Sequence, residues 1–294
     1  MKKNDLKKTL LENQIELTQF VIDNLSSGMP WSKCFGFGGG GEFPKSISSG
    51  KRYSGGNVFW LAMVQARENY STNEWGTYKA WKKAGANVQK GQKSTRIIFY
   101  KPCFKEDKST NEKKTFWVLK SYSVFNRDQT DLEKEKEVDC PELFTVDGNL
   151  FDYLDSEEIK IQDTNGRAFY RPSDDSVGLP KEYTAEDAGY AVVAHEIIHS
   201  TGHKSRLGRD GIVDLNFFGS HSYSYEELIA ELGSMFLCSD LGYESDFTKQ
   251  NGAAYLSSWI KRLESNPQWL WKAAGEASRA CAFVLDRLTE NNTK

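Results

Sequence analysis

Hydrophobic spacing over the first 130 residues predicts three helices followed by a β-hairpin. Apolar residues recur at helical spacing over residues 4–25, 58–66 and 77–84, and Gly85 follows the third segment. The stripe of the first helix consists of Leu6, Leu10, Leu17 and Val21, widened by Ile15 and Phe20 and interrupted by Asn13 and Gln14. Two runs rich in β-branched and aromatic residues, 95–101 and 115–125, predict strands, and the charged segment between them predicts an exposed hairpin loop.

The second half of the chain carries two helical patterns and a weaker sheet pattern. Residues 188–194 are small and apolar, as in a buried helix, and Gly202 stands where a C-terminal glycine would end that helix. Residues 223–237 predict another helix, and residues 168–179 predict the edge of a small sheet. Together these patterns predict an α+β fold, with a basic N-terminal α/β domain followed by a mainly helical domain.

Charge is divided unevenly along the chain, although the net charge of −3 is small. Residues 1–130 hold 22 Lys and Arg against 11 Asp and Glu, whereas the remainder holds 16 against 30. Such asymmetry indicates a basic module for nucleic acid joined to an acidic module with a different task. We therefore expect a DNA-binding domain at residues 1–130, a charged linker at 131–141 and a second domain at 142–294.

Composition argues against several other classes of protein. The five cysteines form no CxxC pair and are odd in number, which favours reduced thiols of a cytoplasmic protein over a disulfide framework. No stretch approaches the ~20 apolar residues that a membrane span needs, so we expect no membrane partner. The glycine tract at residues 36–41 lacks the GxxxxGK[ST] pattern of a phosphate-binding loop, and we interpret it as a flexible connector.

The ten residues AHEIIHSTGH at positions 194–203 carry the clearest chemical signal. His195 and His199 are four residues apart, so on a helix both imidazoles lie on one face and can hold one divalent ion. Glu196 between them is placed to act as the general base. The chain has four histidines, and three of them fall within this segment, which argues against a chance occurrence.

A catalytic metal site needs a third protein ligand beside its open position. On the predicted helix 223–237, Glu227, Ala230, Glu231 and Ser234 share one face, and the small residues allow a close approach to the histidine helix. We expect Glu227 to be the third ligand. We expect Glu231, one turn further on, to accept a hydrogen bond from a ligand imidazole.

Two alternatives for the third ligand remain, Glu231 and His203. On a continuous helix His203 would lie about 12 Å along the axis from His195, which is too far to share an ion. A ligand set of nitrogen and oxygen atoms predicts one divalent metal, Zn²⁺ in the first place, with Mn²⁺ or Co²⁺ also accepted. The stabiliser of a developing oxyanion stays open among Tyr170, Arg206, His203 and His221.

Basic and aromatic residues interleave in the first domain, as they do in proteins that bind single-stranded nucleic acid. The residues predicted to contact DNA are Tyr53, Asn57, Trp75, Tyr78, Lys90, Lys93 and Arg96. For Tyr53, Trp75 and Tyr78 a place in the hydrophobic core is the alternative. The predicted partner is single-stranded DNA, with double-stranded DNA as an alternative.

Several motifs resemble those of ArdC-type antirestriction proteins. In the first half the motifs are GKRYSGGN at residues 50–57, WGTY at 75–78, VQKGQK at 88–93 and YSVFN at 122–126. In the second half they are GRAFY at 166–170, Leu179-Pro180, the histidine segment, Arg206-Leu207 and EELIAE at 226–231. The resemblance implies a single-stranded-DNA-binding domain followed by a zincin-like metallopeptidase domain.

Antirestriction implies a plasmid- or phage-borne protein that shields incoming DNA from host restriction endonucleases. Three functions remain open at this point. In the first, DNA occupancy protects against restriction and the metal site is auxiliary. In the second, the protein is a zinc protease that cleaves a host factor such as a restriction subunit. The third is a general single-strand-binding protein with a structural metal site.

Overall fold

A computed structural model describes residues 3–27, 43–106, 113–132, 149–164, 167–180, 186–213, 221–243 and 253–291. The chain forms two compact units. Unit 1 comprises Met1–Phe20, Phe43–Tyr53 and Asn57–Val138, and unit 2 comprises Val21–Glu42, Ser54–Gly56 and Asp139–Lys294. One boundary falls inside the predicted linker, but unit 2 also takes two segments that the sequence places in the first domain.

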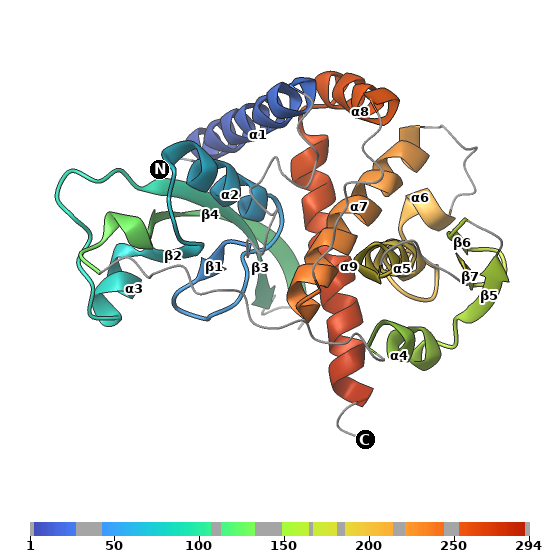
Figure 1. Ribbon diagram of the computed structural model, residues 1–294. Helices are drawn as coiled ribbons and strands as arrows, with labels where there is room; N and C mark the ends of the chain where they lie inside the picture. The colour runs from blue at the N-terminus through green and yellow to red at the C-terminus, as the bar shows by residue number, and fades with distance from the viewer. Residues whose placement is uncertain are drawn as a thin grey trace. The chain divides into compact units, whose positions relative to one another are not determined.

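Unit 1 is built on a four-stranded sheet with the strand order β1-β2-β4-β3 (Figure 1). The strands are β1 (Lys45–Ser46), β2 (Glu74–Thr77), β3 (Thr95–Glu106) and β4 (Lys113–Asn126). The long antiparallel pairing of β3 with β4 confirms the predicted pair of strands. Residues 102–106 and 113–114, predicted to be loop, continue the ladder, and residues 107–112 lie outside the described residues.

The helical elements of this part of the chain are α1 (Lys3–Ser26), α2 (Gly56–Glu68), α3 (Tyr78–Lys83) and the 3₁₀ turn η2 (Arg127–Gln129). The three predicted helices are confirmed to within a few residues. In α1, however, Ile15 is 49% exposed while the amides of Asn13 and Gln14 are buried. Asn13 Nδ2 donates to the carbonyl oxygen of Arg96 on β3 at 3.4 Å, so Asn13 faces the sheet. The prediction that Ile15 widens the buried stripe is wrong.

Two side chains fasten the helices of unit 1 to its sheet. Asn57, buried at the start of α2, donates from Nδ2 to the carbonyl of Ile98 at 2.9 Å and accepts from the N–H of Ile98 at 3.1 Å. The amide thereby satisfies both backbone groups of one β3 residue, as a neighbouring strand would. Trp81 on α3 is fully buried and its Nε1 donates to the carbonyl of Phe125 on β4 at 2.9 Å.

Unit 2 combines a small sheet with a group of helices. Its sheet has the order β5-β7-β6, with β5 (Lys160–Thr164) parallel to β7 (Ser176–Pro180) and β6 (Phe169–Arg171) antiparallel to β7. The β6–β7 hairpin confirms the predicted sheet edge, and β5 was not predicted. The described helices are α4 (Asn149–Ser156), α5 (Glu186–Thr201), α6 (Asp210–Val213), α7 (His221–Leu241), α8 (Ala253–Ser265) and α9 (Trp269–Asn291).

α7 forms the centre of unit 2, because it packs against both α5 and α9 (Figure 1). Small residues permit this close packing: Ala230 and Ser234 on α7 are fully buried. A Cβ at Gly233 would lie 2.7 Å from a methyl carbon of Ile198 on α5, so glycine is required where these two helices meet.

The glycine tract at residues 36–41 lies outside the described residues, as does most of the predicted linker. Among the helices that the structure does describe, none combines the length and apolar character needed to cross a membrane.

Candidate metal centre

α5 presents two imidazoles on one face, because His195 and His199 are about one turn apart. The helix ends at Thr201, as predicted, but Gly202 does not adopt the left-handed conformation of a helix-ending glycine. A Cβ at Gly202 would lie 2.6 Å from Cγ1 of Ile212 and 3.0 Å from Nη2 of Arg209. The glycine is therefore needed for close packing against the segment that follows α5.

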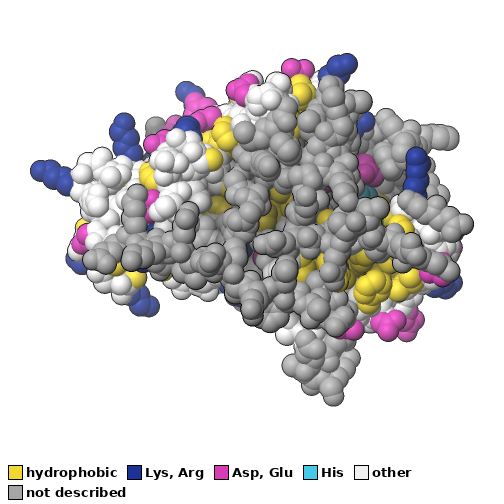
Figure 2. Space-filling view, viewed as in Figure 1, with side chains coloured by type: hydrophobic (Ala, Val, Ile, Leu, Met, Phe, Trp, Pro, Cys, Tyr) yellow, Lys and Arg dark blue, Asp and Glu magenta, His cyan; other side chains and the backbone are white. Residues whose placement is uncertain are grey.

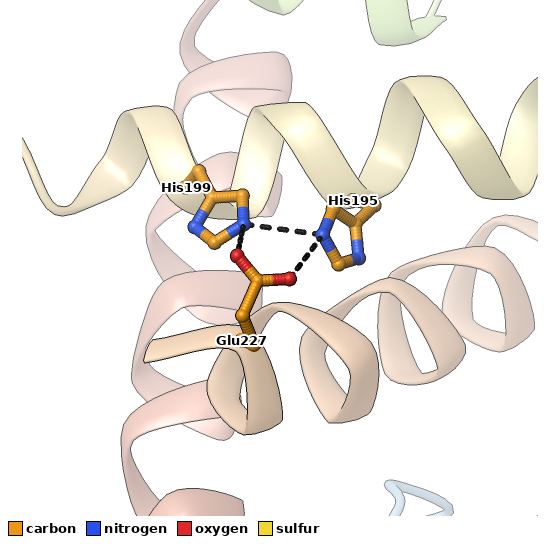
Figure 3. A group of neighbouring side chains, drawn as sticks. All are labelled: His195, His199 and Glu227. Atoms are coloured by element: carbon orange, nitrogen blue, oxygen red, sulfur yellow. Dashed lines mark hydrogen bonds and ion pairs between the residues drawn. The ribbon is translucent and has the colours of Figure 1, made fainter. Parts of the chain in front are cut away.

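The structure brings the three predicted ligands together from two helices (Figure 3). Nε2 of His199 lies 3.1 Å from Nε2 of His195 and 3.4 Å from Oε1 of Glu227. Nε2 of His195 lies 3.6 Å from Oε2 of Glu227. The carboxylate of Glu227 on α7 thus faces both imidazoles of α5.

This arrangement fits a single divalent ion. Two protein atoms that bind one zinc ion, each at about 2.0–2.2 Å, are separated by no more than about 4.4 Å. The three distances given above are shorter than this limit, and two of them end on different oxygens of Glu227. With one donor atom from each residue, the three donors lie within 4.8 Å of one another. The donors are two nitrogens and one carboxylate oxygen, which is a ligand set of catalytic zinc sites and is also accepted by other first-row metals.

Carboxylates raise the pKa of both imidazoles. Burial alone would lower the pKa of His195, but its hydrogen bond with Glu227 reverses the effect. Burial likewise opposes the charge on His199, yet Glu226 and Glu227 raise its pKa to about 10. Burial would raise the pKa of Glu227, and the two imidazoles instead lower it far below its ordinary value. Glu227 therefore attracts both imidazoles, whereas His199 lowers the pKa of His195.

Glu196 lies beside the ligand cluster and is 7% exposed. Burial raises the pKa of its carboxyl group, and the neighbouring imidazoles oppose this effect. A carboxyl group with a raised pKa exchanges a proton more readily near neutral pH, as a general base must. The environment of Glu196 therefore suits the role predicted for it.

Glu226 is a residue that the sequence reasoning missed. Its Oε1 lies 3.4 Å from Nδ1 of His199, on the side of the ring away from the ligand cluster. Glu231 is buried one turn beyond Glu227 on α7, and its charge raises the pKa of His195. That Glu231 accepts a hydrogen bond from an imidazole stays a prediction. The adjacent glutamates at 226 and 227 were the available signal, since a ligand histidine usually gives its second N–H to a carboxylate.

The structure separates the candidates for an oxyanion stabiliser. The guanidinium of Arg206 is fully engaged, because it contacts both oxygens of Asp175, the carbonyl of Ser200 at 2.7 Å and the hydroxyl of Tyr170 at 3.2 Å. The Tyr170 hydroxyl itself donates to Asp175 at 2.7 Å. Both side chains are thus engaged with each other and with Asp175. His203 is half-buried with Nδ1 2.8 Å from Ser205 Oγ, and the side chain of His221 lies outside the description.

The predicted DNA-contacting residues fall into two groups in unit 1. Trp75 is fully buried, Tyr53 is 8% exposed and Asn57 is the buried clamp on β3. A buried ring cannot stack on a base, and the buried amide of Asn57 is bonded to Ile98 at both ends. The prediction that Tyr53, Asn57 and Trp75 contact DNA is therefore corrected in favour of core roles. Exposed side chains are found instead at Tyr78, Lys90, Lys93 and Arg96.

Exposed cations accompany Tyr78 in this part of unit 1. Tyr78 begins α3 and is 52% exposed, and α3 ends on exposed Lys82 and Lys83. Figure 2 shows Lys and Arg side chains projecting from the end of unit 1 that carries α3. Gln129 anchors the segment between α3 and β3, since its Nε2 donates to the carbonyl of Lys93 at 2.9 Å. Unit 1 therefore offers an exposed ring at Tyr78 and an anchored basic segment before β3.

Comparisons with known proteins agree with this arrangement. Residues 12–125 match the family described as the N-terminal domain of anti-restriction factor ArdC, and residues 150–276 match a zincin-like metallopeptidase family. The crystal structure of the antirestriction protein ArdC from plasmid R388, in its metal-free form, shares 32% sequence identity and covers 94% of this chain and 98% of that one, with a TM-score of 0.71. The chain belongs to the ArdC family of antirestriction proteins.

Other relatives add to the picture of this ArdC-family chain. The Mn(II)-bound structure of the R388 ArdC protein matches with 31% identity and a TM-score of 0.70, over 94% of this chain and 97% of that one. Together with the zincin-like family match, that structure supports a divalent metal. Two Escherichia coli proteins named DNA primase TraC are 33% and 34% identical over 92% and 90% of this chain. The chain spans only 27% and 19% of their lengths.

Proposed function

We propose that this chain is an antirestriction protein of a mobile element that binds single-stranded DNA through unit 1 and protects incoming DNA in the host cytoplasm. The observation that supports its second activity most directly is the meeting of His195, His199 and Glu227 beside the buried Glu196. On that basis unit 2 is a metal-dependent peptidase centre. The substrate of this centre is a host protein.

In the proposed centre His195, His199 and Glu227 hold one divalent ion, zinc in the first place and manganese or cobalt as alternatives. Such an ion supplies Lewis-acid polarisation of a peptide carbonyl. Glu196 removes the proton of the attacking water and passes it to the amine that leaves. Burial assists this transfer, because it raises the pKa of the Glu196 carboxyl group.

The proposed DNA surface consists of Tyr78, Lys90, Lys93 and Arg96, all of which have exposed side chains. A base stacks on the Tyr78 ring, and the cations neutralise phosphates. The hydrogen bond from Gln129 to the Lys93 carbonyl holds the basic segment in place before DNA arrives. A surface that is already ordered loses less conformational entropy on binding.

A restriction-challenge transfer assay tests the proposed function. A restricting host receives unmodified DNA from donors that express the wild type, Glu196→Gln, or Lys90→Ala/Lys93→Ala. Glu196→Gln removes the base and leaves the three ligands, so protection through DNA occupancy should persist in it. The double lysine variant should lose protection, because it binds DNA more weakly.

Each result has a different consequence for the proposal. If only Glu196→Gln lost protection, the mechanism of protection would be proteolysis of a host factor and not DNA occupancy. Absence of protection by the wild type, with DNA binding intact, would leave a general single-strand-binding protein. Hydrolysis of protein substrates by the wild type and not by Glu196→Gln would establish the peptidase.

A further inference from the structure

A buried ion pair lies behind the candidate ligands. Arg209 follows α5 and Glu226 lies on α7 next to Glu227, and their side chains are only 6% and 3% exposed. Nη2 of Arg209 donates to Oε1 of Glu226 at 2.6 Å, and Nε donates to Oε2 at 3.0 Å. This two-point contact is the strong, directional form of an arginine–carboxylate interaction.

Stability alone is a weak explanation for such a pair. Removing two charges from water costs several kcal/mol per ion, and apolar residues of similar volume often stabilise a protein as well or better. A second role therefore has to come from what the two side chains hold in place.

Arg209 also holds the end of the histidine helix. Its Nη1 donates to Oγ1 of Thr201 at 2.7 Å, and its Nη2 donates to the carbonyl of Ile198 at 2.7 Å. One guanidinium thereby joins the last turn of α5 to Glu226 on α7. Gly202 makes room for this contact, because a Cβ at that position would lie 3.0 Å from Nη2 of Arg209.

Glu226 carries the connection to the ligand cluster. Its Oε1, the oxygen that Nη2 of Arg209 contacts, lies 3.4 Å from Nδ1 of His199. A histidine that binds a metal through Nε2 keeps its proton on Nδ1, and an acceptor at Nδ1 fixes both this tautomer and the plane of the ring.

We propose that Arg209 is a positioning residue of the metal centre. It holds the Glu226 carboxylate against Nδ1 of His199, and it thereby keeps Nε2 of His199 directed at His195 and Glu227. This inference rests on the proposed role of His199 as a ligand. The polar contacts that the structure gives for Arg209 are with Glu226, Thr201 and Ile198, and none of these is a candidate ligand.

The chain offers a matched control in Arg206. Its side chain is 2% exposed, forms a two-point ion pair with Asp175, and donates to the Ser200 carbonyl on α5 at 2.7 Å. Its polar contacts among the described residues reach Glu157 and Tyr170 as well, but no candidate metal ligand. Arg206 thus shares burial, charge and attachment to α5 with Arg209 and lacks the path to His199.

The experiment compares full-length Arg209→Lys and Arg206→Lys with the wild type. Lysine keeps the positive charge and loses the forked geometry that makes the two-point contact. Co²⁺ is titrated into the metal-free proteins, and its visible absorption reports both affinity and ligand geometry. Arg209→Lys should weaken Co²⁺ binding about 10–100-fold and change the spectrum, because a displaced outer partner misplaces the ligand. Arg206→Lys should leave affinity and spectrum unchanged, whatever its thermal unfolding temperature.

Glu226→Gln is a second variant that tests the same connection if Arg209→Lys does not fold. It keeps the side-chain shape and should weaken Co²⁺ binding in the same way. The double variant should lose no more than the stronger single variant, because both substitutions act through one connection. Wild-type affinity and spectrum in Arg209→Lys or, where that variant does not fold, in Glu226→Gln would overturn the inference, as would an equal loss in Arg206→Lys. A wild type that binds no divalent ion would instead overturn the proposed metal centre, and this inference with it.

Discussion

Each candidate ligand contributes one donor atom, so single substitutions test the site directly. His195→Ala and His199→Ala should lose the ion, and Glu227→Ala should bind it more weakly, because each removes one of three converging donors. His203→Ala is the control, since the His203 ring lies against Ser205. Elemental analysis after gel filtration measures the metal content. Full metal content in Glu227→Ala, with loss in His203→Ala, would identify a different third ligand.

Trp75 and Tyr78 lie three residues apart but should respond differently to substitution. Trp75 is fully buried, so Trp75→Ala should lower the free energy of unfolding by about 3–5 kcal/mol. Tyr78 is 52% exposed, so Tyr78→Ala should change stability by less than about 0.5 kcal/mol.

When affinity for DNA is measured, Tyr78→Ala should lose more than Trp75→Ala. If a base stacks on Tyr78, its loss should weaken single-strand binding by about 1–3 kcal/mol, measured by fluorescence anisotropy. Urea unfolding gives the stability of both variants. Unchanged DNA affinity in a folded Tyr78→Ala protein would remove this residue from the proposed surface.

The sequence predicted the ligand pair but missed Glu226, for a physical reason. The spacing of His195 and His199 is set by one helix, and helical periodicity is a local property that sequence displays. Glu226 points about 100° around α7 from Glu227. Its contact with His199 depends on how α7 crosses α5, which is decided by packing. The burial of Trp75 was likewise hidden, because a strand of four residues gives little periodic signal, and Tyr53 lies in no helix or strand that could give one.

At the scale of elements, the contact between α5 and α7 decides the geometry of the site. A Cβ at Gly233 would lie 2.7 Å from Cγ2 of Ile198, one residue before His199. Gly233→Ala should therefore push the helices apart, lower stability by about 1–3 kcal/mol and weaken metal binding. Adding Ile198→Ala, which removes the side-chain carbons that the new Cβ would meet, should recover part of the loss of metal binding.

Gly275 on α9 is the control for this substitution, because a Cβ there meets nothing within 4 Å. Gly275→Ala should leave metal binding unchanged and stabilise its helix by up to about 1 kcal/mol. Calorimetry of unfolding and metal titration measure both quantities. Wild-type metal affinity in Gly233→Ala would show that the two helices tolerate a wider separation.

The length of an element decided whether the sequence predicted it. The helices and the β3–β4 pair repeat their pattern over enough residues to be recognised. β2 and β5 have four and five residues, and their pairing partners lie far along the chain or across a parallel connection. The Asn57 clamp on Ile98 was missed because it joins residues that are 41 positions apart.

At the scale of the whole molecule, the proposed function gives the two units separate tasks, and the two units carry opposite net charge. The logarithm of the affinity of the full chain for single-stranded DNA should fall linearly with the logarithm of the salt concentration. The slope should be about −0.7 for each phosphate contacted. Lys90→Ala or Lys93→Ala should flatten that slope by about 0.7 and weaken binding to all sequences alike.

A chelator should leave DNA binding unchanged, because the candidate ligands all belong to unit 2. Anisotropy titrations at several salt concentrations, with and without chelator, test both expectations. Loss of DNA binding on chelation would mean that the metal also supports the DNA-binding surface.

Unit 2 is built from segments that lie far apart in the chain, and this affects when it can fold during synthesis. The N–H of Gly55 donates to Oγ of Ser278, 223 positions later. At the usual rates of translation, about 5–20 residues per second, Gly55 waits roughly 10–45 seconds for this partner. α7 packs against α9, so it lacks this partner until α9 leaves the ribosome. Products truncated before α9 should therefore be recognised by cellular proteases, even when they already contain every candidate metal ligand.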